Sequence, residues 1–268
     1  MERSSKGLAV ITGASSGIGA VYADRLAHRG YDLLLVARDR KRMGDLALKL
    51  AATRSHVDIL GANLTDPRDL AKLERILRED SSVTMLVNNA GVGATEPLLH
   101  SNIDDMSRMI ALNVAAPMRL TYAVVPAFVK RHGGAIINVA SVVALAPDLL
   151  NGVYGGTKAF LLRFSESLQH ELANTGVQVQ VVLPGATATN FWDAAGKPVE
   201  NLPQEIVMSA EDMVDASLAG FDQGEFVTIP ALPDPGQWAS YEAARQALRP
   251  NLSHAAPAGR YAVAHAAR

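Results

Sequence analysis

Two residues one helical turn apart, Tyr154 and Lys158, are the first candidates for chemistry in this sequence. Residues four positions apart lie on one face of a helix, so the phenol and the ammonium can converge on one site. A phenol with a pKa of about 10 is a poor acid–base catalyst at neutral pH, and a nearby ammonium favours its ionised form. Because a surface tyrosine stacked on a lysine stem is common, the pair needs support from other residues.

A glycine-rich turn follows the first apolar run of the chain. Its residues are Thr12, Gly13, Ala14, Ser15, Ser16, Gly17, Ile18 and Gly19. Glycine lets the backbone approach a pyrophosphate, and the N-terminus of the following helix offers unpaired N–H groups. Ser15 and Ser16 add hydroxyl donors or a helix cap. The spacing G-x-x-x-G-x-G differs from the fingerprint G-x-G-x-x-G, so a tight connection without a ligand stays open as an alternative.

The end of the second apolar run bears on the choice of nucleotide. In dinucleotide-binding folds an acidic residue here binds the ribose hydroxyls, whereas a basic residue binds a 2′-phosphate. The run ends with Ala37 and Arg38, and a guanidinium suits phosphate. NADP(H) is therefore favoured as cofactor. NAD(H) remains possible because Asp39 follows, and Arg38 could also be a plain surface residue at a helix start.

Short apolar runs alternate with longer segments of helical period along most of the chain. The predicted strands are Leu8–Thr12, Asp32–Ala37, His56–Ala62, Met85–Asn88, Ala135–Ala140, Gln178–Leu183 and Phe226–Ile229. The predicted helices are Gly17–Arg29, Asp39–Thr53, Pro67–Glu79, Asp104–Arg131, Val153–Asn174 and Ala210–Gly220. This alternation predicts an α/β, single-domain Rossmann fold, with a doubly wound, seven-stranded parallel sheet flanked by helices.

One domain is expected over residues 1–268, with two departures from the regular alternation. Residues 186–208 carry Gly196, Pro198 and Pro203, which break any long helix, and this stretch is predicted to be a substrate lid. Residues 231–268 are predicted to be a C-terminal extension with a short helix at Gln237–Leu248. The sequence shows no internal repeat and no second domain boundary.

Composition narrows the classes of partner. A formal net charge of −2 gives no general attraction for nucleic acid or an anionic membrane, so a small-molecule substrate is expected. The chain has no cysteine, which excludes disulfides and thiolate chemistry and fits a reducing compartment. No histidine pair has metal-ligand spacing, so no metal site is expected.

Neither export nor membrane insertion is expected from the hydrophobic pattern. The segment Met1–Lys6 is short and polar, unlike a signal peptide. The longest apolar stretches, 110–129 and 135–147, are interrupted by polar residues that are costly in a bilayer. These residues are Asn113, Arg119, Asn138 and Ser141. A cytoplasmic protein without a membrane span is predicted.

Four further motifs accompany the glycine turn and the Tyr154–Lys158 pair. The fourth strand is followed by Asn88-Asn89-Ala90-Gly91, and Asn113 lies in the next long helix. Ser141 follows the fifth strand, and Pro184-Gly185 closes the sixth. With these motifs in this order, the sequence resembles the short-chain dehydrogenase/reductase family over about residues 7–230.

The resemblance implies a set of catalytic roles. Tyr154 exchanges a proton with the substrate oxygen, and Lys158 holds the nicotinamide ribose and lowers the pKa of Tyr154. Ser141 hydrogen-bonds the carbonyl, and Asn113 completes a proton relay through water. The implied activity is hydride transfer between NADP(H) and a carbonyl or a secondary alcohol. An epimerase or dehydratase, or a non-catalytic NADP-binding protein on the same fold, is the alternative.

The resemblance also implies positions that contact the cofactor, besides the glycine turn, Arg38, Tyr154 and Lys158. They are Asn89, Ala90, Gly91, Pro184, Gly185, Thr187 and Thr189. At the adenine-contacting place the family commonly has Asp, whereas this chain has Asn63, followed by Leu64; an amide can still bind the adenine edge. A homodimer or homotetramer formed through the two long helices is implied as well.

The substrate is expected to be medium-sized and hydrophobic. Apolar residues near the lid favour such a pocket, although each could equally belong to the core. These residues are Leu145, Leu149, Leu150, Phe191, Trp192 and Met208.

Overall fold

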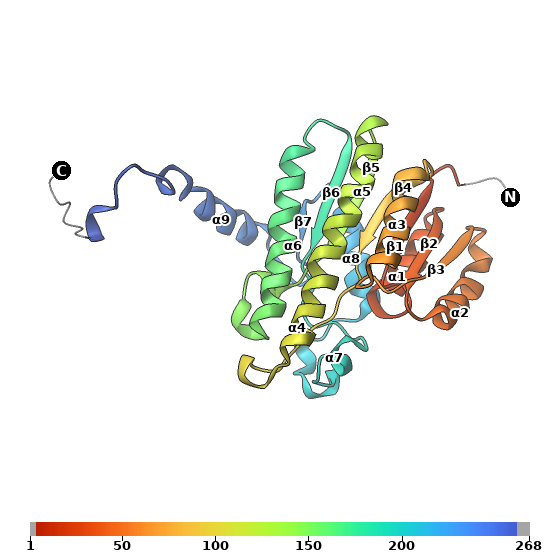
Figure 1. Ribbon diagram of the computed structural model, residues 1–268, viewed down its shortest axis with the longest axis horizontal. Coiled ribbons are helices and arrows are strands. Elements are labelled where there is room, and N and C mark those ends of the chain that lie inside the picture. Colours follow the sequence, from red (N-terminus) through yellow and green to blue (C-terminus); the bar gives the residue numbers. More distant parts are fainter. Residues whose placement is uncertain (1–3, 262–268) are drawn as a thin grey trace. The chain divides into compact units, whose positions relative to one another are not determined.

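The short apolar runs form one parallel sheet in the computed structural model, which describes residues 4–261 (Figure 1). Its strands are β1 (Leu8–Thr12), β2 (Asp32–Ala37), β3 (Val57–Gly61), β4 (Val83–Asn88), β5 (Gly134–Val139), β6 (Val177–Val182) and β7 (Val227–Thr228). Their order is β3-β2-β1-β4-β5-β6-β7, and every neighbouring pair is parallel. The predicted seven-stranded parallel sheet is confirmed.

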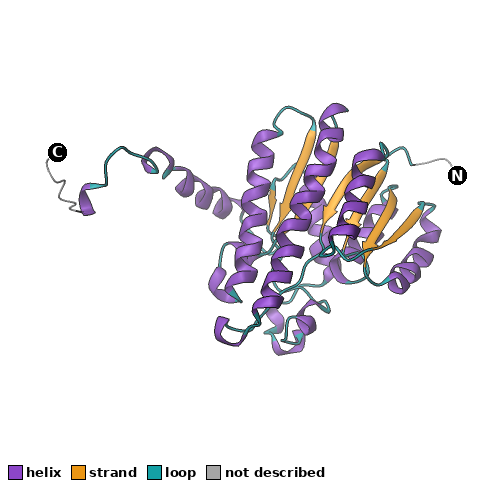
Figure 2. Cartoon of the chain, in the orientation of Figure 1, coloured by secondary structure: helices purple, strands orange, loops and turns teal. Residues whose placement is uncertain are grey.

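Helices cover both faces of the sheet (Figure 2). They are α1 (Gly17–His28), α2 (Arg40–Leu50), α3 (Pro67–Glu79), α4 (Ile103–Ile110), α5 (Ala116–Lys130), α6 (Gly152–Glu171), α7 (Phe191–Ala194) and α8 (Ala210–Asp222). Tyr22 of α1 and Met213 of α8 pack with Ile11 on one face, and Leu73 of α3 and Phe128 of α5 are in the core on the other. Burial of each such side chain stabilises the fold by about 1.5–3 kcal/mol.

The strand order makes the chain diverge between β1 and β4, in the middle of the sheet. β1 and β4 are neighbours, but the chain leaves β1 toward β2 and leaves β4 toward β5. In such doubly wound sheets ligands bind beyond the carboxyl ends of the strands at this point of divergence. The glycine turn follows β1 and Asn89 follows β4, so the fold places both motifs there.

The predicted long helix at Asp104–Arg131 is not a regular α-helix. A π-helical turn at Ala111–Ala115 separates α4 from α5, and it contains Asn113. Such turns are rare and often lie at functional sites. The described run Ile103–Lys130 is long and apolar enough to cross a membrane by length and composition alone. In the structure 44% of its most apolar window is buried within the protein.

The chain divides into two compact units, Met1–Pro230 and Ala231–Arg268. In the second unit α9 (Pro235–Gln246) begins two residues earlier than the predicted helix, since Asp234 caps it by accepting a hydrogen bond from the Gly236 amide at 2.8 Å. Trp238 and Tyr241 pack together on α9, with ring centroids 5.4 Å apart. The single catalytic domain with an extension after Pro230 stays a prediction.

Candidate active site

The glycine turn needs glycine at three places for different reasons. Gly13 and Gly17 have φ values of +69° and +52°, in the left-handed region that side chains disfavour. A Cβ at Gly19 would lie 2.3 Å from the carbonyl oxygen of Gly13. Ser16 precedes α1 but makes no capping hydrogen bond, so the expected cap is absent and its hydroxyl does not occupy the helix N-terminus. This arrangement suits a bound phosphate.

Thr12 and Asn89 tie the glycine turn to the end of β4. The Thr12 hydroxyl oxygen accepts hydrogen bonds from the amides of Asn89 and Ala90, both at 3.0 Å. The Asn89 carboxamide donates to the carbonyl oxygens of Thr12 at 2.9 Å and of Gly13 at 3.3 Å. Asn89 therefore stabilises the shape of the turn through these hydrogen bonds. Its contact with the cofactor stays a prediction. The sequence places Thr12 in the turn, but its role in tying the turn to β4 was not predicted, since its place before Gly13 is the only signal.

The four predicted catalytic residues are all buried. The exposed fraction is 2% for Asn113, 9% for Ser141, 5% for Tyr154 and 7% for Lys158. The Lys158 Nζ atom lies 5.8 Å from the centre of the Tyr154 ring. A methyl group added at Gly91 would lie 3.2 Å from Asn113 Oδ1 and 3.6 Å from Lys158 Nζ. The fold thus brings Gly91, Asn113, Tyr154 and Lys158 to one place.

Asn151 fixes the start of α6 and so the position of Tyr154. Its carboxamide oxygen accepts hydrogen bonds from the amides of Val153 at 2.9 Å and Tyr154 at 3.4 Å. Its nitrogen donates to the carbonyl oxygen of Glu96 at 2.7 Å, which joins α6 to the segment after β4. Asparagine is a strong N-cap, and this signal in the sequence was missed.

Asn113 connects the π-helical turn to both neighbouring elements. Its Oδ1 accepts from the Val92 amide at 3.0 Å, and its Nδ2 donates to the Val92 carbonyl at 2.8 Å. Nδ2 also donates to the Thr157 hydroxyl at 3.1 Å, which in turn donates to the Tyr154 carbonyl at 2.8 Å. The side chain of Asn113 is thereby fixed between the segment after β4 and α6. Thr157 and Val92 were not anticipated from the sequence.

Burial dominates the ionisation of the Tyr154–Lys158 pair. It raises the pKa of Tyr154 to about 12, while hydrogen bonding with Ser141 acts in the opposite direction. It lowers the pKa of Lys158 to about 8, and Lys158 Nζ donates to the Val139 carbonyl at 2.9 Å. Desolvation therefore outweighs the hydrogen bonding in setting the pKa of Tyr154, and the lowering of this pKa by Lys158 stays a prediction. At neutral pH Tyr154 keeps its proton.

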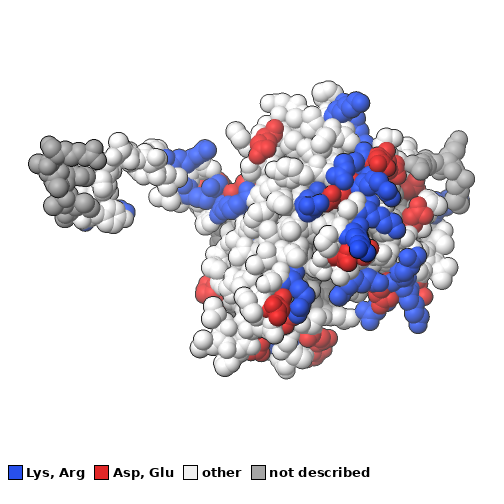
Figure 3. Space-filling view, viewed as in Figure 1, with Lys and Arg blue, Asp and Glu red and all other residues white. Residues whose placement is uncertain are grey.

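Arg38 lies directly after β2, where its exposed guanidinium makes no hydrogen bond or ion pair with any described residue. Arg42, by contrast, pairs with Asp39 at 3.4 Å. Lys and Arg side chains gather over α2 (Figure 3). Asn63 Oδ1 accepts from the Thr65 amide and hydroxyl at 3.2 and 2.9 Å, and Leu64 is buried. Arg38 is thus free to meet an anion, whereas the Asn63 oxygen has local donors.

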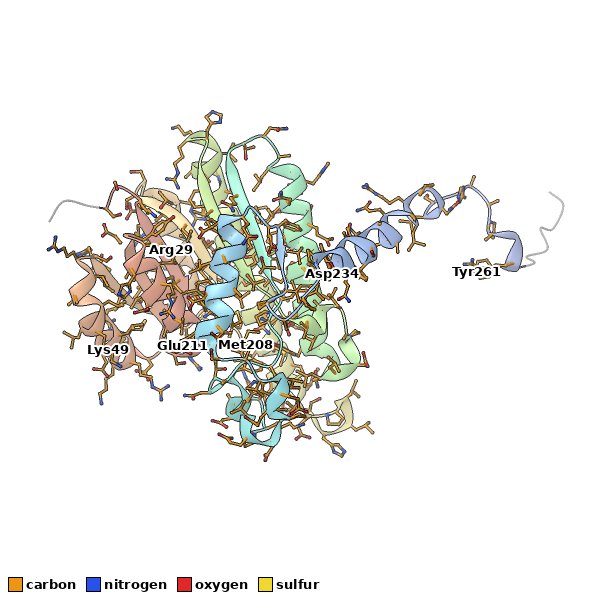
Figure 4. The ribbon with its side chains drawn as sticks, turned by 180° about the vertical axis from the view of Figure 1, so that it is seen from behind. Arg29, Lys49, Met208, Glu211, Asp234 and Tyr261 are labelled. Atoms are coloured by element: carbon orange, nitrogen blue, oxygen red, sulfur yellow. The ribbon has the colours of Figure 1, made fainter. Side chains whose placement is uncertain are left out.

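The predicted lid at 186–208 is closed at its base by backbone hydrogen bonds. Met208, labelled before α8 in Figure 4, donates to the Ala186 carbonyl at 2.9 Å and accepts from the Ala188 amide at 2.8 Å. Within the lid Thr189 lies against the glycine turn, since a Cβ at Gly17 would lie 3.0 Å from the Thr189 methyl group.

The other predicted cofactor positions near β6 are held by local hydrogen bonds. The Pro184 carbonyl accepts from the Val142 amide at 3.0 Å, and the Thr187 hydroxyl donates to the Gly185 carbonyl at 3.2 Å.

The predicted pocket residues do not all share one environment. Phe191 and Leu150 pack against a buried cluster that includes Tyr154, Met106, Met109 and Val143. The two methionines of α4 were missed because they fit an ordinary core helix equally well. Trp192 is buried, Leu145 is partly buried and Met208 packs against the core of the α1 face, whereas Leu149 is 60% exposed.

Comparison with known proteins identifies the family of this fold and site. A model described as short chain dehydrogenase matches residues 7–199. A short-chain dehydrogenase from Sphingobium yanoikuyae, solved in complex with NADPH, is 46% identical, covers 95% of this chain and 99% of its own, and has a TM-score of 0.92. The bulky-bulky ketone specific alcohol dehydrogenase of Comamonas testosteroni is 44% identical over 95% of this chain and 98% of its own, with a TM-score of 0.88.

A curated relative is also named an oxidoreductase. An uncharacterized oxidoreductase of Staphylococcus epidermidis is 29% identical over 83% of this chain and 94% of its own length. The sheet order and the glycine turn are typical of a dinucleotide-binding fold. The chain belongs to the short-chain dehydrogenase family, and the predicted family, fold and enzyme class are confirmed.

Proposed function

We propose that this protein uses NADPH to reduce a ketone with bulky apolar substituents, with Tyr154 as the proton donor. The observation that carries the proposal is the Tyr154 phenol, which is only 5% exposed within an apolar cluster, where burial raises its pKa to about 12. A buried acid next to a hydroxyl donor is suited to a substrate whose oxygen gains negative charge during the reaction.

The residues around the glycine turn fit a dinucleotide. A Cβ at Gly19 would fill the turn, the N-terminus of α1 has no side-chain cap, and Arg38 has no partner among the described residues. When bound, the nicotinamide supplies the hydride. Lys158 would hold the ribose beside it, and the Thr12–Asn89 link keeps the turn in shape.

The side chains of the site then divide the remaining work. Ser141 and Tyr154 orient the carbonyl oxygen through their hydroxyl groups, and Tyr154 transfers its proton to that oxygen. Lys158 stabilises the resulting phenolate by its charge. Asn113 holds the segment after β4 against α6, so that Tyr154 and Gly91 keep their spacing. The lid excludes water from the carbonyl.

Two relatives support the choice of cofactor and substrate. The Sphingobium enzyme binds NADPH, and the Comamonas enzyme is specific for bulky-bulky ketones. In this chain the buried cluster around Tyr154 is apolar, formed by Met106, Met109 and Val143. An apolar wall of this kind fits hydrocarbon substituents better than hydroxylated ones.

Turnover with a substrate panel tests this function. The purified protein is assayed with diaryl ketones, methyl ketones, aldehydes and secondary alcohols, each with NADPH or NADP⁺ and with NADH or NAD⁺, by nicotinamide absorbance. We expect oxidation of NADPH with diaryl or other bulky ketones. If a substrate were isomerised or dehydrated without net change in the nicotinamide, the protein would instead be an epimerase or dehydratase.

Replacement of Arg38 by Ala is expected to raise the KM for NADPH by about tenfold or more and to leave the KM for NADH nearly unchanged. A charged hydrogen bond to the 2′-phosphate contributes about 1.5–3 kcal/mol, and NADH lacks that group. Arg42→Ala is the matched control, because Arg42 is also exposed near α2 but pairs with Asp39. An equal loss with both cofactors, or a wild-type preference for NADH, would contradict this assignment.

We further propose a cytoplasmic homodimer or homotetramer that pairs through α5 and α6. Tyr122 of α5 is 71% exposed and stacks on Phe164 of α6 at 6.4 Å, and Phe164 stacks on Phe160 at 5.6 Å. This row of aromatic rings is suited to burial against a second copy, and it lies beside a hollow whose lining adds charged groups that a partner can pair with. The hollow is lined by Glu74, Arg78, Met118, Arg119 and Tyr122.

A further inference from the structure

Phe191, the first residue of α7 in the lid, lies against the ring of the proposed proton donor. The centroids of the Phe191 and Tyr154 rings are 5.7 Å apart, with an angle of 45° between the ring planes. On its other side Phe191 meets Trp192 edge-on, at 5.7 Å and 88°. Trp192 is fixed by a hydrogen bond from its indole N–H to the Thr187 carbonyl at 3.0 Å. The lid therefore holds the Phe191 ring in a defined place beside Tyr154.

Gly93 leaves the space that the Phe191 ring occupies. A Cβ at Gly93 would lie 2.2 Å from Cζ and 2.8 Å from Cε2 of Phe191. The backbone itself does not require glycine there, because Gly93 is not among the residues with positive φ. The absence of a side chain at Gly93 is thus matched to the Phe191 ring.

Apolar side chains form a buried cluster around the two rings. Met106, Met109 and Val143 are buried there with Tyr154, and Val92 and Leu150 pack beside them. In the proposed reaction the carbonyl oxygen meets the hydroxyls of Tyr154 and Ser141. A ketone held there has two substituents, and the side of the Tyr154 ring that faces Phe191 offers an apolar wall to one of them.

We propose that Phe191 determines the size of the ketone substituent that lies beside Tyr154. The inference rests on the proposed reduction and adds which residue limits the substrate. The Phe191 ring and an aryl or branched alkyl substituent compete for the same apolar space next to Tyr154. The side chain at position 191 therefore selects between ketones with one large substituent and ketones with two.

Substitutions at position 191 test this inference with two ketones that differ in one substituent. The probes are acetophenone, which has a methyl group and a phenyl group, and benzophenone, which has two phenyl groups. Phe191→Ala is expected to raise the ratio of kcat/KM for benzophenone to that for acetophenone by about tenfold or more, since a few methylene equivalents change selectivity by that amount. Phe191→Trp is expected to lower the ratio.

Ile206→Ala is the matched control, because Ile206 is an apolar residue of the same lid that is 57% exposed. It should leave the ratio within about twofold of the wild-type value. If Phe191→Ala and Phe191→Trp changed the ratio no more than Ile206→Ala does, Phe191 would not determine substituent size.

Gly93→Ala tests independently whether the position of the Phe191 ring matters. In the wild-type background the added methyl group displaces the Phe191 ring, so the ratio for the two ketones should change. In the Phe191→Ala background no ring is present, and Gly93→Ala should add no further change. Equal effects of Gly93→Ala in both backgrounds would show that the two residues act independently and would overturn the inference.

A binding measurement separates this inference from the proposed reaction. Benzophenone is titrated calorimetrically into Tyr154→Phe and into the double variant Tyr154→Phe/Phe191→Ala, both saturated with NADP⁺, so that no hydride is available and no turnover occurs. At least fivefold tighter binding to the double variant supports the role of Phe191, and equal binding contradicts it. Absence of any ketone turnover by the wild type would reject the proposed reaction, while the binding comparison still decides the role of Phe191.

Discussion

Replacement of Tyr154 by Phe is expected to lower kcat for ketone reduction by about 100-fold or more, as loss of a general acid does. The substitution removes only the hydroxyl group. Tyr154 is only 5% exposed, and the centre of its ring lies 5.7 Å from that of Phe191, so the phenyl ring keeps its contacts. Because the pKa of Tyr154 is raised to about 12, the phenol stays protonated across the neutral pH range. The loss of kcat should therefore be similar at all pH values from about 6 to 9.

The affinity for NADPH provides the control for this variant. Titration of protein fluorescence should give a Kd for NADPH within about twofold of the wild-type value, because the hydroxyl acts on the substrate oxygen. Undiminished kcat in Tyr154→Phe would exclude Tyr154 as the proton donor. A large loss of NADPH affinity would instead assign Tyr154 to cofactor binding.

Replacement of Gly19 by Ala is expected to weaken NADPH binding by about tenfold or more and to lower the melting temperature. Alanine in a helix is normally more stable than glycine, by about 1 kcal/mol. Here the new methyl group would lie 2.3 Å from the Gly13 carbonyl oxygen and 2.5 Å from the Asn89 carboxamide. The backbone of the turn must move, and the Asn89 hydrogen bonds that shape it must lengthen.

Gly44→Ala in α2 is the matched control for Gly19→Ala. Gly44 is also helical, and a Cβ there would have no heavy atom within 4 Å. Gly44→Ala should therefore keep NADPH affinity and raise the melting temperature slightly. If Gly19→Ala behaved in the same way, the close packing of the turn would not be required for cofactor binding.

Much of the fold could be predicted from the sequence because local signals and burial agree. The helix at Pro67–Glu79 has the predicted bounds, since Asp66 caps it and proline opens it. The strands at Leu8–Thr12 and Asp32–Ala37 are also as predicted, because each is an almost uninterrupted apolar run buried on both faces. The π-helical turn at Ala111–Ala115 could not be predicted, because it depends on packing that the local sequence does not encode.

The site was predictable in its outline and unpredictable in its supports. The glycine turn and the ordered Asn113, Ser141, Tyr154 and Lys158 set are spaced recognisably along the chain. The support from Thr12 could not be predicted, because it reaches Asn89, which is 77 positions away. The rise in the Tyr154 pKa caused by burial could not be predicted for a related reason, since the degree of burial of a phenol is a property of the folded chain.

The π-helical turn also sets the rotational phase of the helices on either side. One inserted residue rotates everything after it by about 100° relative to everything before it, because an α-helix has 3.6 residues per turn. Met106 of α4 can therefore line the space beside Tyr154, while Leu120 of α5 lies in the core against the sheet. Deletion of one residue from Ala111–Ala115 would restore a regular helix. It would also rotate α4 relative to α5, so that Met106 and Leu120 could not both keep their present neighbours.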